Sequence, residues 1–152
     1  KPVSLKLLIN EENKERNMMA QEIKRQLLDV GIDTEIVAVP FDTYKSKLRA
    51  NDFDLYIGEI GLSDDLDLSP VLHPSELSGY GTTQSSASFM KYQKYAKGEI
   101  GEKELTDMLT SDIPFIPIAY GDALLYHKRN FVSDIVATTD DIFYNILNWK
   151  IE

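Results

Sequence analysis

The residues best suited to chemistry lie in an acidic stretch near the middle of the chain. Counted from residue 65, oxygen-bearing side chains occupy positions 1, 3, 5 and 12, the spacing of ligands in a calcium-binding loop: Asp65, Asp67, Ser69 and Glu76. Position 6 is Pro70, although the sharp turn of such a loop requires glycine there. This departure favours a solvated or helix-capping acidic loop over a calcium site.

Other candidates for catalytic chemistry are few. The two histidines, His73 and His127, lie 54 positions apart, and neither stands in an HExxH pattern or accompanies a GxSxG serine. The acid pairs at 64–65 and 140–141 could act as general acid and base. Paired acids in an acidic protein more often cap helices or increase solubility. We therefore expect a protein without enzymatic activity and without a cofactor.

Composition excludes several classes of partner and site. The chain of 152 residues carries 16 basic and 25 acidic side chains, a net charge of −9, so nucleic acid is not an expected partner. It has no cysteine, and hence no disulfide or thiolate metal site. The sequence Gly58-Glu59-Ile60-Gly61 lacks the spacing of a phosphate-binding loop, which disfavours nucleotides. No apolar run is long enough to span a membrane, so we expect no direct membrane insertion.

Hydrophobic periodicity predicts the elements that position these residues. Strands are expected at 3–9, 32–39 and 53–58, because apolar side chains there alternate or run together. One helix is expected after Asn10 and another after Asp42, with these two residues as N-caps. The β-α-β-α-β order is typical of an α/β fold, a mostly parallel sheet flanked by helices.

The rest of the chain is predicted to be less regular. Residues 59–84 form a long loop with at most one helical turn, near 69–72, and a loop of this length inside a domain is usually functional or mobile. Two helices and several later, mixed strands follow, at 86–96, 102–110, 113–120, 123–128 and 143–151.

The carboxyl edge of the predicted sheet is the expected binding site, since ligands of open α/β sheets bind beyond the carboxyl ends of the strands. This layout brings together Glu59, the acidic loop with Asp64 and Asp65, and the pair Tyr80 and Gly81. We interpret these residues as candidates for ligand binding. The tyrosine could equally pack the loop against the sheet.

Five segments resemble one known family in the same order and spacing. They are 5–10, the helix end and turn at 26–32, Phe-Asp-Leu-Tyr-Ile-Gly at 53–58, Ile-Pro-Phe-Ile-Pro-Ile at 113–118, and 143–151. Together they resemble bacterial extracellular solute-binding proteins of family 5. These are the oligopeptide, dipeptide and nickel receptors of ABC importers.

The resemblance implies a fragment of a larger receptor. Family members are longer and close two lobes around an extended peptide, and this chain resembles the C-terminal portion. Residues 1–120 would be one ligand-binding lobe, and the strands of 121–152 would return toward the missing first lobe. The implied location is extracytoplasmic, in the periplasm or on the cell surface as part of a lipoprotein. The implied partners are a peptide or small solute and, through the full receptor, the permease subunits in the membrane.

The resemblance also suggests which residue meets the ligand's amine. In the family, the loop after the third strand carries an aromatic residue and then an aspartate that pairs with the peptide's amino terminus. Here Ile60 stands at the aromatic position. Ser63 takes the aspartate position without a gap, and Asp64 takes it if one residue is inserted, so Asp64 or Asp65 is the expected partner of the amine.

Three other interpretations remain open. The ligand could be nickel or another metal chelate, although two histidines supply few ligands. A small acidic hydrolase could use the acidic loop with a divalent metal. An interaction domain could present an aromatic stripe at helical spacing, Phe89, Tyr92 and Tyr95, although such a stripe is more often core.

Overall fold

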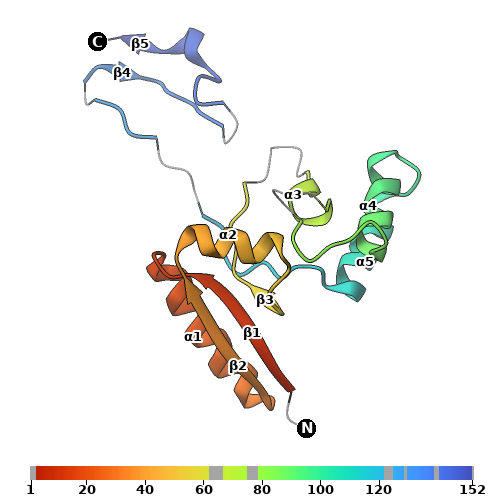
Figure 1. Cartoon of the computed structure of the whole chain (residues 1–152). Coiled ribbons are helices and arrows are strands. Elements are labelled where there is room, and N and C mark those ends of the chain that lie inside the picture. Colours follow the sequence, from red (N-terminus) through yellow and green to blue (C-terminus); the bar gives the residue numbers. More distant parts are fainter. Residues whose placement is uncertain are drawn as a thin grey trace. The chain divides into compact units, whose positions relative to one another are not determined.

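The chain divides into two compact units. Unit 1 comprises Lys1–Ile60 and Pro74–Gln84, and unit 2 comprises Gly61–His73 and Ser85–Glu152. The computed structural model (Figure 1) describes residues 3–61, 67–74, 79–121, 125–128, 130–138 and 141–151.

Unit 1 contains a three-stranded parallel sheet. Its strands are β1 (Val3–Asn10), β2 (Ile32–Val39) and β3 (Leu55–Tyr56), in the spatial order β2-β1-β3. β1 and β2 pair over their whole length, with Val3 opposite Ile32 and Asn10 opposite Val39. The predicted β-α-β-α-β order and the α/β fold class are confirmed.

The third strand is shorter than the predicted 53–58. Only Leu55 and Tyr56 pair with β1. One further backbone hydrogen bond on each side, at 3.2 Å, extends the contact to Asp54 and Ile57. Among the described strands β3 has β1 as its one neighbour, so this pairing alone sets its length.

The first helix begins later than predicted. α1 (Lys14–Asp29) is capped by Asn13, whose side chain accepts a hydrogen bond from the Arg16 N–H at 2.9 Å. Asn10, the predicted cap, instead makes a turn, because its Oδ1 accepts from the N–H of Glu12 at 3.1 Å. Both asparagines satisfy backbone donors, and the chain passes from strand to helix through the segment between them.

The second helix begins one residue earlier than its predicted cap. α2 (Phe41–Arg49) starts directly after Pro40. Asp42 therefore lies in the first turn and pairs with Lys45 at 2.9 Å instead of capping the helix. An acid in this turn still suits the positive end of the helix dipole.

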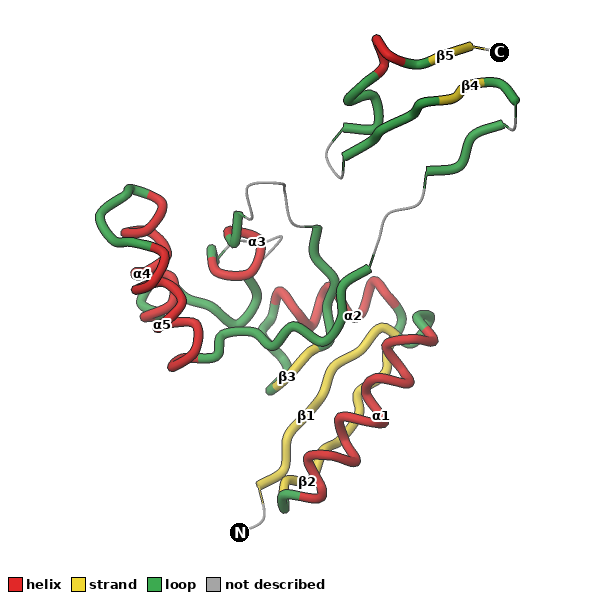
Figure 2. The backbone as a smooth tube through the Cα atoms, turned by 180° about the vertical axis from the view of Figure 1, so that it is seen from behind, coloured by secondary structure: helices red, strands yellow, loops and turns green. Residues whose placement is uncertain are grey.

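The sheet of unit 1 is covered on both faces, as Figure 2 shows from behind. Two buried clusters result, one beneath each helix: Leu7, Ile9, Ala20 and Ile57 beneath α1, and Leu8, Tyr44 and Leu48 beneath α2. Successive residues of a strand point to opposite faces, so the apolar run of β1 supplies both clusters. The central strand is the most deeply buried part of the unit.

The predicted helices of unit 2 are present. α3 (Ser69–Leu72) is a single turn, α4 (Ala87–Ala96) follows Ser86, and α5 (Glu102–Asp112) extends two residues beyond its predicted end. α4 and α5 pack against each other, and their apolar residues Phe89, Leu105 and Met108 are buried.

The predicted strands at 113–120 and 143–151 are wrong. Residues 113–121 have no regular structure, and the last stretch contains turns, the 3₁₀ helix η1 (Ile146–Asn148) and only a short strand, β5 (Lys150–Ile151). β5 pairs antiparallel with β4 (Val132–Ser133), which had no clear sequence signal. Of the predicted strand at 123–128, residues 125–128 are not a strand and 123–124 lie outside the described residues. Prolines at 114 and 117 lack an N–H, and no described strand lies beside this segment as a partner.

Candidate functional site

The carboxyl edge of the unit 1 sheet is a topological switch point. From β1 the chain crosses to β2 on one side, and from β2 it crosses back over β1 to β3 on the other. In open α/β sheets, ligands bind beyond the carboxyl ends of the strands at such a point. The residues there are 10–13, after β1, and 58–61, after β3.

The loop after β1 is held by hydrogen bonds to its surroundings. The Glu11 N–H donates to the Val39 oxygen at 3.0 Å, and the Asn17 amide donates to the Glu11 oxygen at 3.0 Å. Glu12 accepts from the Phe41 N–H at 3.3 Å, at the start of α2. One short loop thus joins the N-terminal ends of both helices, where carboxylates are favoured by the helix dipole.

The loop after β3 needs glycine at its start. A Cβ atom on Gly58 would lie 2.8 Å from the ring of Tyr56, closer than carbon atoms approach without displacement. The next residue, Glu59, lies at the predicted edge. Its Oε2 pairs with a guanidinium nitrogen of Arg16 at 3.0 Å. The Arg16 side chain is 14% exposed and that of Glu59 is 81% exposed, so a sheltered cation faces an open carboxylate.

An aromatic layer supports this edge from the α2 face of the sheet. The buried hydroxyl of Tyr44 donates to the Ile57 oxygen at 2.9 Å. Burial raises the pKa of Tyr44 to about 12, since the phenolate would lose its hydration, while the positive charge of Arg16 acts in the opposite direction. The ring of Tyr56 packs edge-on against Phe53 and Tyr80. Burial raises the pKa of Tyr56 as well.

The sequence layout predicted that Tyr80 and Gly81 lie at the carboxyl edge with Glu59. The structure anchors their turn at a different place. The Gly81 N–H donates to Asn51 Oδ1 at 3.3 Å, and Gly81 has a φ of +87° beside the ring of Phe53. Asn51 precedes β3, whereas Glu59 follows it, so the backbone of this turn is anchored at the amino end of the strand. The reason is the direction of α2, which runs back from β2 and ends beside the start of β3.

The turn containing Tyr80 borders a separate open hollow. Its volume is about 580 Å³, and it is lined by Arg49, Asn51, Pro74, Gly79, Tyr80, Gly81 and Thr82. Because the Tyr80 ring belongs to the aromatic layer, the packing role that the sequence left open for this tyrosine is observed.

Three predicted site residues, Ser63, Asp64 and Asp65, lie outside the described residues. So does Glu76, the last ligand of the hypothetical calcium loop. Within the described residues, the acidic stretch caps a helix, which agrees with the helix-capping interpretation of this loop. The carboxylate of Asp67 accepts from the Ser69 N–H at 2.9 Å at the start of α3, and from the Ser69 hydroxyl. Bonds from Ser69 and Tyr92 hold the pKa of Asp67 below its usual range.

The aromatic stripe of α4 is only partly exposed. Phe89 is buried and packs edge-on against His73, whereas Tyr92 is half-buried and donates its hydroxyl to Asp67. Tyr95 is 39% exposed. Most of the stripe therefore belongs to the interior of unit 2, consistent with the core alternative.

Sequence reasoning missed three residues of the carboxyl edge. Asn13 caps α1, Glu12 meets the start of α2, and Arg16 pairs with Glu59 across 43 positions. The first of these had a signal, since asparagine is a preferred N-cap. Nothing in the sequence pairs Arg16 with Glu59, because their contact depends on the order of the strands. Within the described ranges, no group of three potential metal ligands is found.

No protein-family model matches the chain, and no curated protein matches it. Among solved structures, the whole chain is similar to part of the oligopeptide-binding protein AppA from Bacillus subtilis, in complex with a nonapeptide. The TM-score is 0.62 and the sequence identity is 18%. The chain shares its fold with a portion of that protein.

The likeness extends over 100% of this chain but only 32% of the matched protein, so the chain spans about a third of the length of that protein. At this identity the similarity shows the fold alone. No helix among the residues that the structure describes is long and apolar enough to cross a membrane.

Proposed function

We propose that the chain is part of an extracytoplasmic solute receptor that binds a peptide and delivers it to an ABC importer. The observation that carries this proposal is the fold shared, over the whole chain, with a peptide-binding protein. The five sequence segments that resemble solute-binding proteins of family 5 support the same proposal independently. In this view the chain binds and carries its ligand and performs no chemistry on it.

The ligand binds at the carboxyl edge of the unit 1 sheet. The loops after β1 and β3 supply backbone groups for the main chain of a peptide, which is the usual mode of sequence-tolerant recognition. Glu59 lies at this edge. From the family resemblance, Asp64 or Asp65, next to Ser63 in the sequence, pairs with the ligand's amine, and the net charge of −9 favours a ligand with a cationic group. Tyr80 and Gly81 are not part of this site, because their turn is anchored at the amino end of β3.

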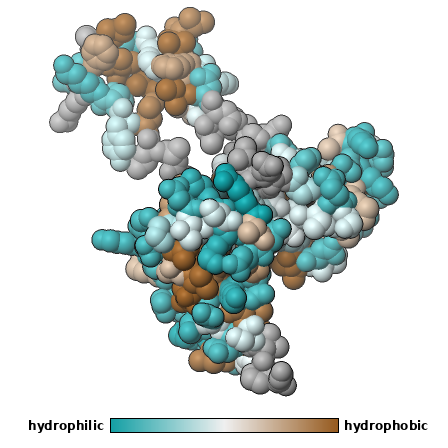
Figure 3. Space-filling model, viewed as in Figure 1, coloured by the Kyte–Doolittle hydropathy of each residue, from teal (hydrophilic) through white to brown (hydrophobic). Residues whose placement is uncertain are grey.

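Residues 1–120 form one lobe and residues 121–152 return toward a further lobe of the same receptor. The exposure of apolar side chains supports this division, since a chain packed only against itself rarely leaves so many in water. Figure 3 shows brown, hydrophobic atoms gathered over the C-terminal segment that carries β4 and β5. The large apolar residues exposed there by half or more are Phe131, Val136, Ile142, Phe143, Tyr144, Ile146, Leu147 and Ile151.

A titration monitored by amide NMR tests the proposal. An equimolar pool of synthetic tri- to nonapeptides is added to the ¹⁵N-labelled chain. We expect shifts at 10–13 and 58–61, and none at 22–29 on the exposed side of α1. Because a second lobe would supply the remaining contacts, the dissociation constant should be about millimolar, near −4 kcal/mol. An absence of shifts at both loops, with peptide in the tens of millimolar, would contradict peptide binding.

The amine contact has its own control. N-acetylation of the pool should weaken binding several-fold, and the double change Asp64→Asn with Asp65→Asn should remove the difference between free and acetylated peptides. The matched variant Asp140→Asn with Asp141→Asn alters the other acid pair by the same charge and should keep the difference.

A further inference from the structure

The hollow beside the Tyr80 turn is lined by hydrogen-bond donors that meet no acceptor. Arg49, the last residue of α2, lines the hollow and makes no hydrogen bond or ion pair with a described residue. Asn51 lines it too. Its Oδ1 accepts from the Gly81 N–H at 3.3 Å, and no hydrogen bond from its Nδ2 is found in the described part of the chain. The residues that line the hollow all belong to unit 1.

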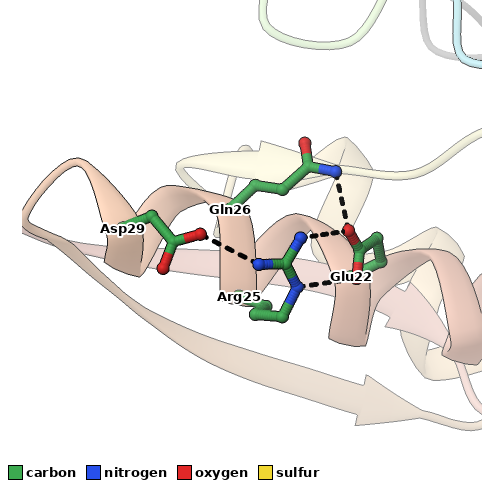
Figure 4. A network of polar contacts seen from close by, with 4 residues as sticks. All are labelled: Glu22, Arg25, Gln26 and Asp29. Atoms are coloured by element: carbon green, nitrogen blue, oxygen red, sulfur yellow. Dashed lines mark hydrogen bonds and ion pairs between the residues drawn. The ribbon is translucent and has the colours of Figure 1, made fainter.

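A second arginine of unit 1 shows what an exposed guanidinium binds when acceptors are within reach (Figure 4). Arg25 binds both carboxylate oxygens of Glu22, at 2.7 and 3.0 Å, and also Asp29 at 2.9 Å. The Arg25 guanidinium and the Gln26 amide hold the pKa of Glu22 at about 2. Two parallel N–H groups on two oxygens are the strongest geometry for such a pair. Arg49 has the same fork of donors, and no carboxylate of the described chain reaches it.

The acids closest to the hollow in the sequence are engaged elsewhere. Asp52 pairs with Lys47 at 2.5 Å, and this lysine holds the pKa of Asp52 below its usual range. Asp54 accepts from the Lys6 N–H at 2.7 Å. Neither carboxylate therefore neutralises Arg49. The negative end of the α2 dipole favours a cation at this position, but it uses none of the N–H donors of the side chain.

Part of the wall of the hollow is a tight turn. The Thr82 N–H donates to the Gly79 oxygen at 3.0 Å, and Gly79 and Gly81 have φ values of +64° and +87°. Tyr80, between the two glycines, packs its ring edge-on against Tyr56. The turn is thus fixed to the aromatic layer. The volume of the hollow, about 580 Å³, lies in the range of sites that bind small organic molecules.

We propose that this hollow is a second binding site, for a small organic molecule that carries a carboxylate or phosphate group. The Arg49 guanidinium binds two oxygens of that group as a fork, and the Asn51 amide donates to it as well. The rest of the molecule lies against the turn at 79–82. The site is at the amino end of β3, so it is separate from the carboxyl edge and stands whether or not that edge binds a peptide.

Amide NMR of the ¹⁵N-labelled chain, titrated with phenyl phosphate, benzoate or neutral benzamide, tests the site. Both anions should shift the amides of 49–52 and 79–82 with a dissociation constant of about a millimolar. Benzamide should bind at least about tenfold more weakly, because it brings no charge to the guanidinium. The amides of 22–29 should stay in place. The anion that binds more tightly identifies which of the two groups the site takes.

Two substitutions and a matched control assign the binding to Arg49. In Arg49→Gln both anions should bind as weakly as benzamide, and in Arg49→Lys, which keeps the charge without the fork, the affinity should be intermediate. Arg25→Gln removes another exposed guanidinium of unit 1 and should leave the binding unchanged. In the unaltered chain, the side-chain Nε–Hε resonance of Arg49 should move with the anions and not with benzamide, a signal that needs no variant.

Three results would overturn the proposal. The first is equal binding of the anions and benzamide by the unaltered chain. The second is undiminished binding of the anions by the Arg49→Gln variant. The third is an absence of shifts at both 49–52 and 79–82 with either anion in the tens of millimolar. None of these results bears on peptide binding, which is read at 10–13 and 58–61.

Discussion

Thr34 is a buried polar residue whose side chain has no hydrogen-bond partner among the described residues. It lies in β2 and is 1% exposed. Its Oγ1 finds neither a donor nor an acceptor, and its register partner in β1 is the apolar Leu5. A buried hydroxyl without a partner loses the hydrogen bonds that water gives it in the unfolded chain. This residue therefore opposes folding at a site remote from the carboxyl edge.

Replacing this hydroxyl with a methyl group should stabilise the protein. Thr34→Val preserves the shape of the side chain, and we expect the free energy of unfolding to rise by about 1 kcal/mol. Urea denaturation followed by circular dichroism measures the change. Thr110→Val is the control, since that hydroxyl is exposed and already donates to the Thr106 oxygen. The idea fails if Thr34→Val gains no more stability than the control.

At the scale of elements, one side chain connects α2 to the end of β3. The Tyr44 hydroxyl donates to the Ile57 oxygen at 2.9 Å, and its ring is buried beside Leu8 and Leu48. β3 has only two paired residues, so this contact supplies part of what holds its carboxyl end in place. The position of the loop that carries Glu59 depends on it.

The same residue should make the protein sensitive to alkali. The pKa of Tyr44 is about 12 in the folded chain and near 10 when exposed, so its contribution is complete below pH 10 and is lost as the pH rises toward 12. We expect a loss on the order of 2 kcal/mol over this range. Tyr44→Phe should flatten that part of the stability curve, although it costs about 1 kcal/mol at neutral pH through the lost hydrogen bond.

Urea unfolding at a series of pH values between 8 and 12 measures this effect. Tyr126→Phe, at a position 85% exposed, should leave the curve unchanged. An equal slope in the Tyr44→Phe variant and the unaltered chain would show that this phenol is not buried in solution.

At the scale of the whole molecule, the chain has one well-buried sheet and a long apolar segment with little regular structure. β1 lies between two strands and beneath two helices. Residues 113–121 and 125–128 form no strand or helix, and several of their large apolar side chains are exposed, Tyr120 by 87%. These two parts should differ in how readily their backbone hydrogen bonds with water.

Hydrogen exchange measures this difference directly. Amides of residues 7–9 should exchange at least about a hundredfold more slowly than the non-proline amides of 114–121, because only the former are both paired and buried. Exchange in 114–121 as slow as in β1 would mean that this segment is paired in solution, and the proposal that it awaits another part of a receptor would lose its support.

The sequence alone determined the α/β fold class, the two crossover helices and the helices α4 and α5. These elements follow from local periodicity over many residues, which needs no knowledge of distant neighbours. Glu59 was also assigned correctly to the end of the third strand, since strand and loop are consecutive there. The start of α1 was misplaced because Asn10 and Asn13 are both suitable caps, and only the length of β1 beside β2 selects between them.

The tertiary structure decided what depends on residues that are distant in the sequence. The order β2-β1-β3 brings Arg16 to Glu59, and the direction of α2 places Gly81 beside Asn51 instead of at the carboxyl edge. The apolar segment at 113–120 has the composition of a strand, yet a strand requires a partner edge, and none is present among the described residues. The hydrophobic pattern of a segment indicates which secondary structure it can form. Strand pairing and strand order depend on contacts across the fold, and they decide which side chains meet.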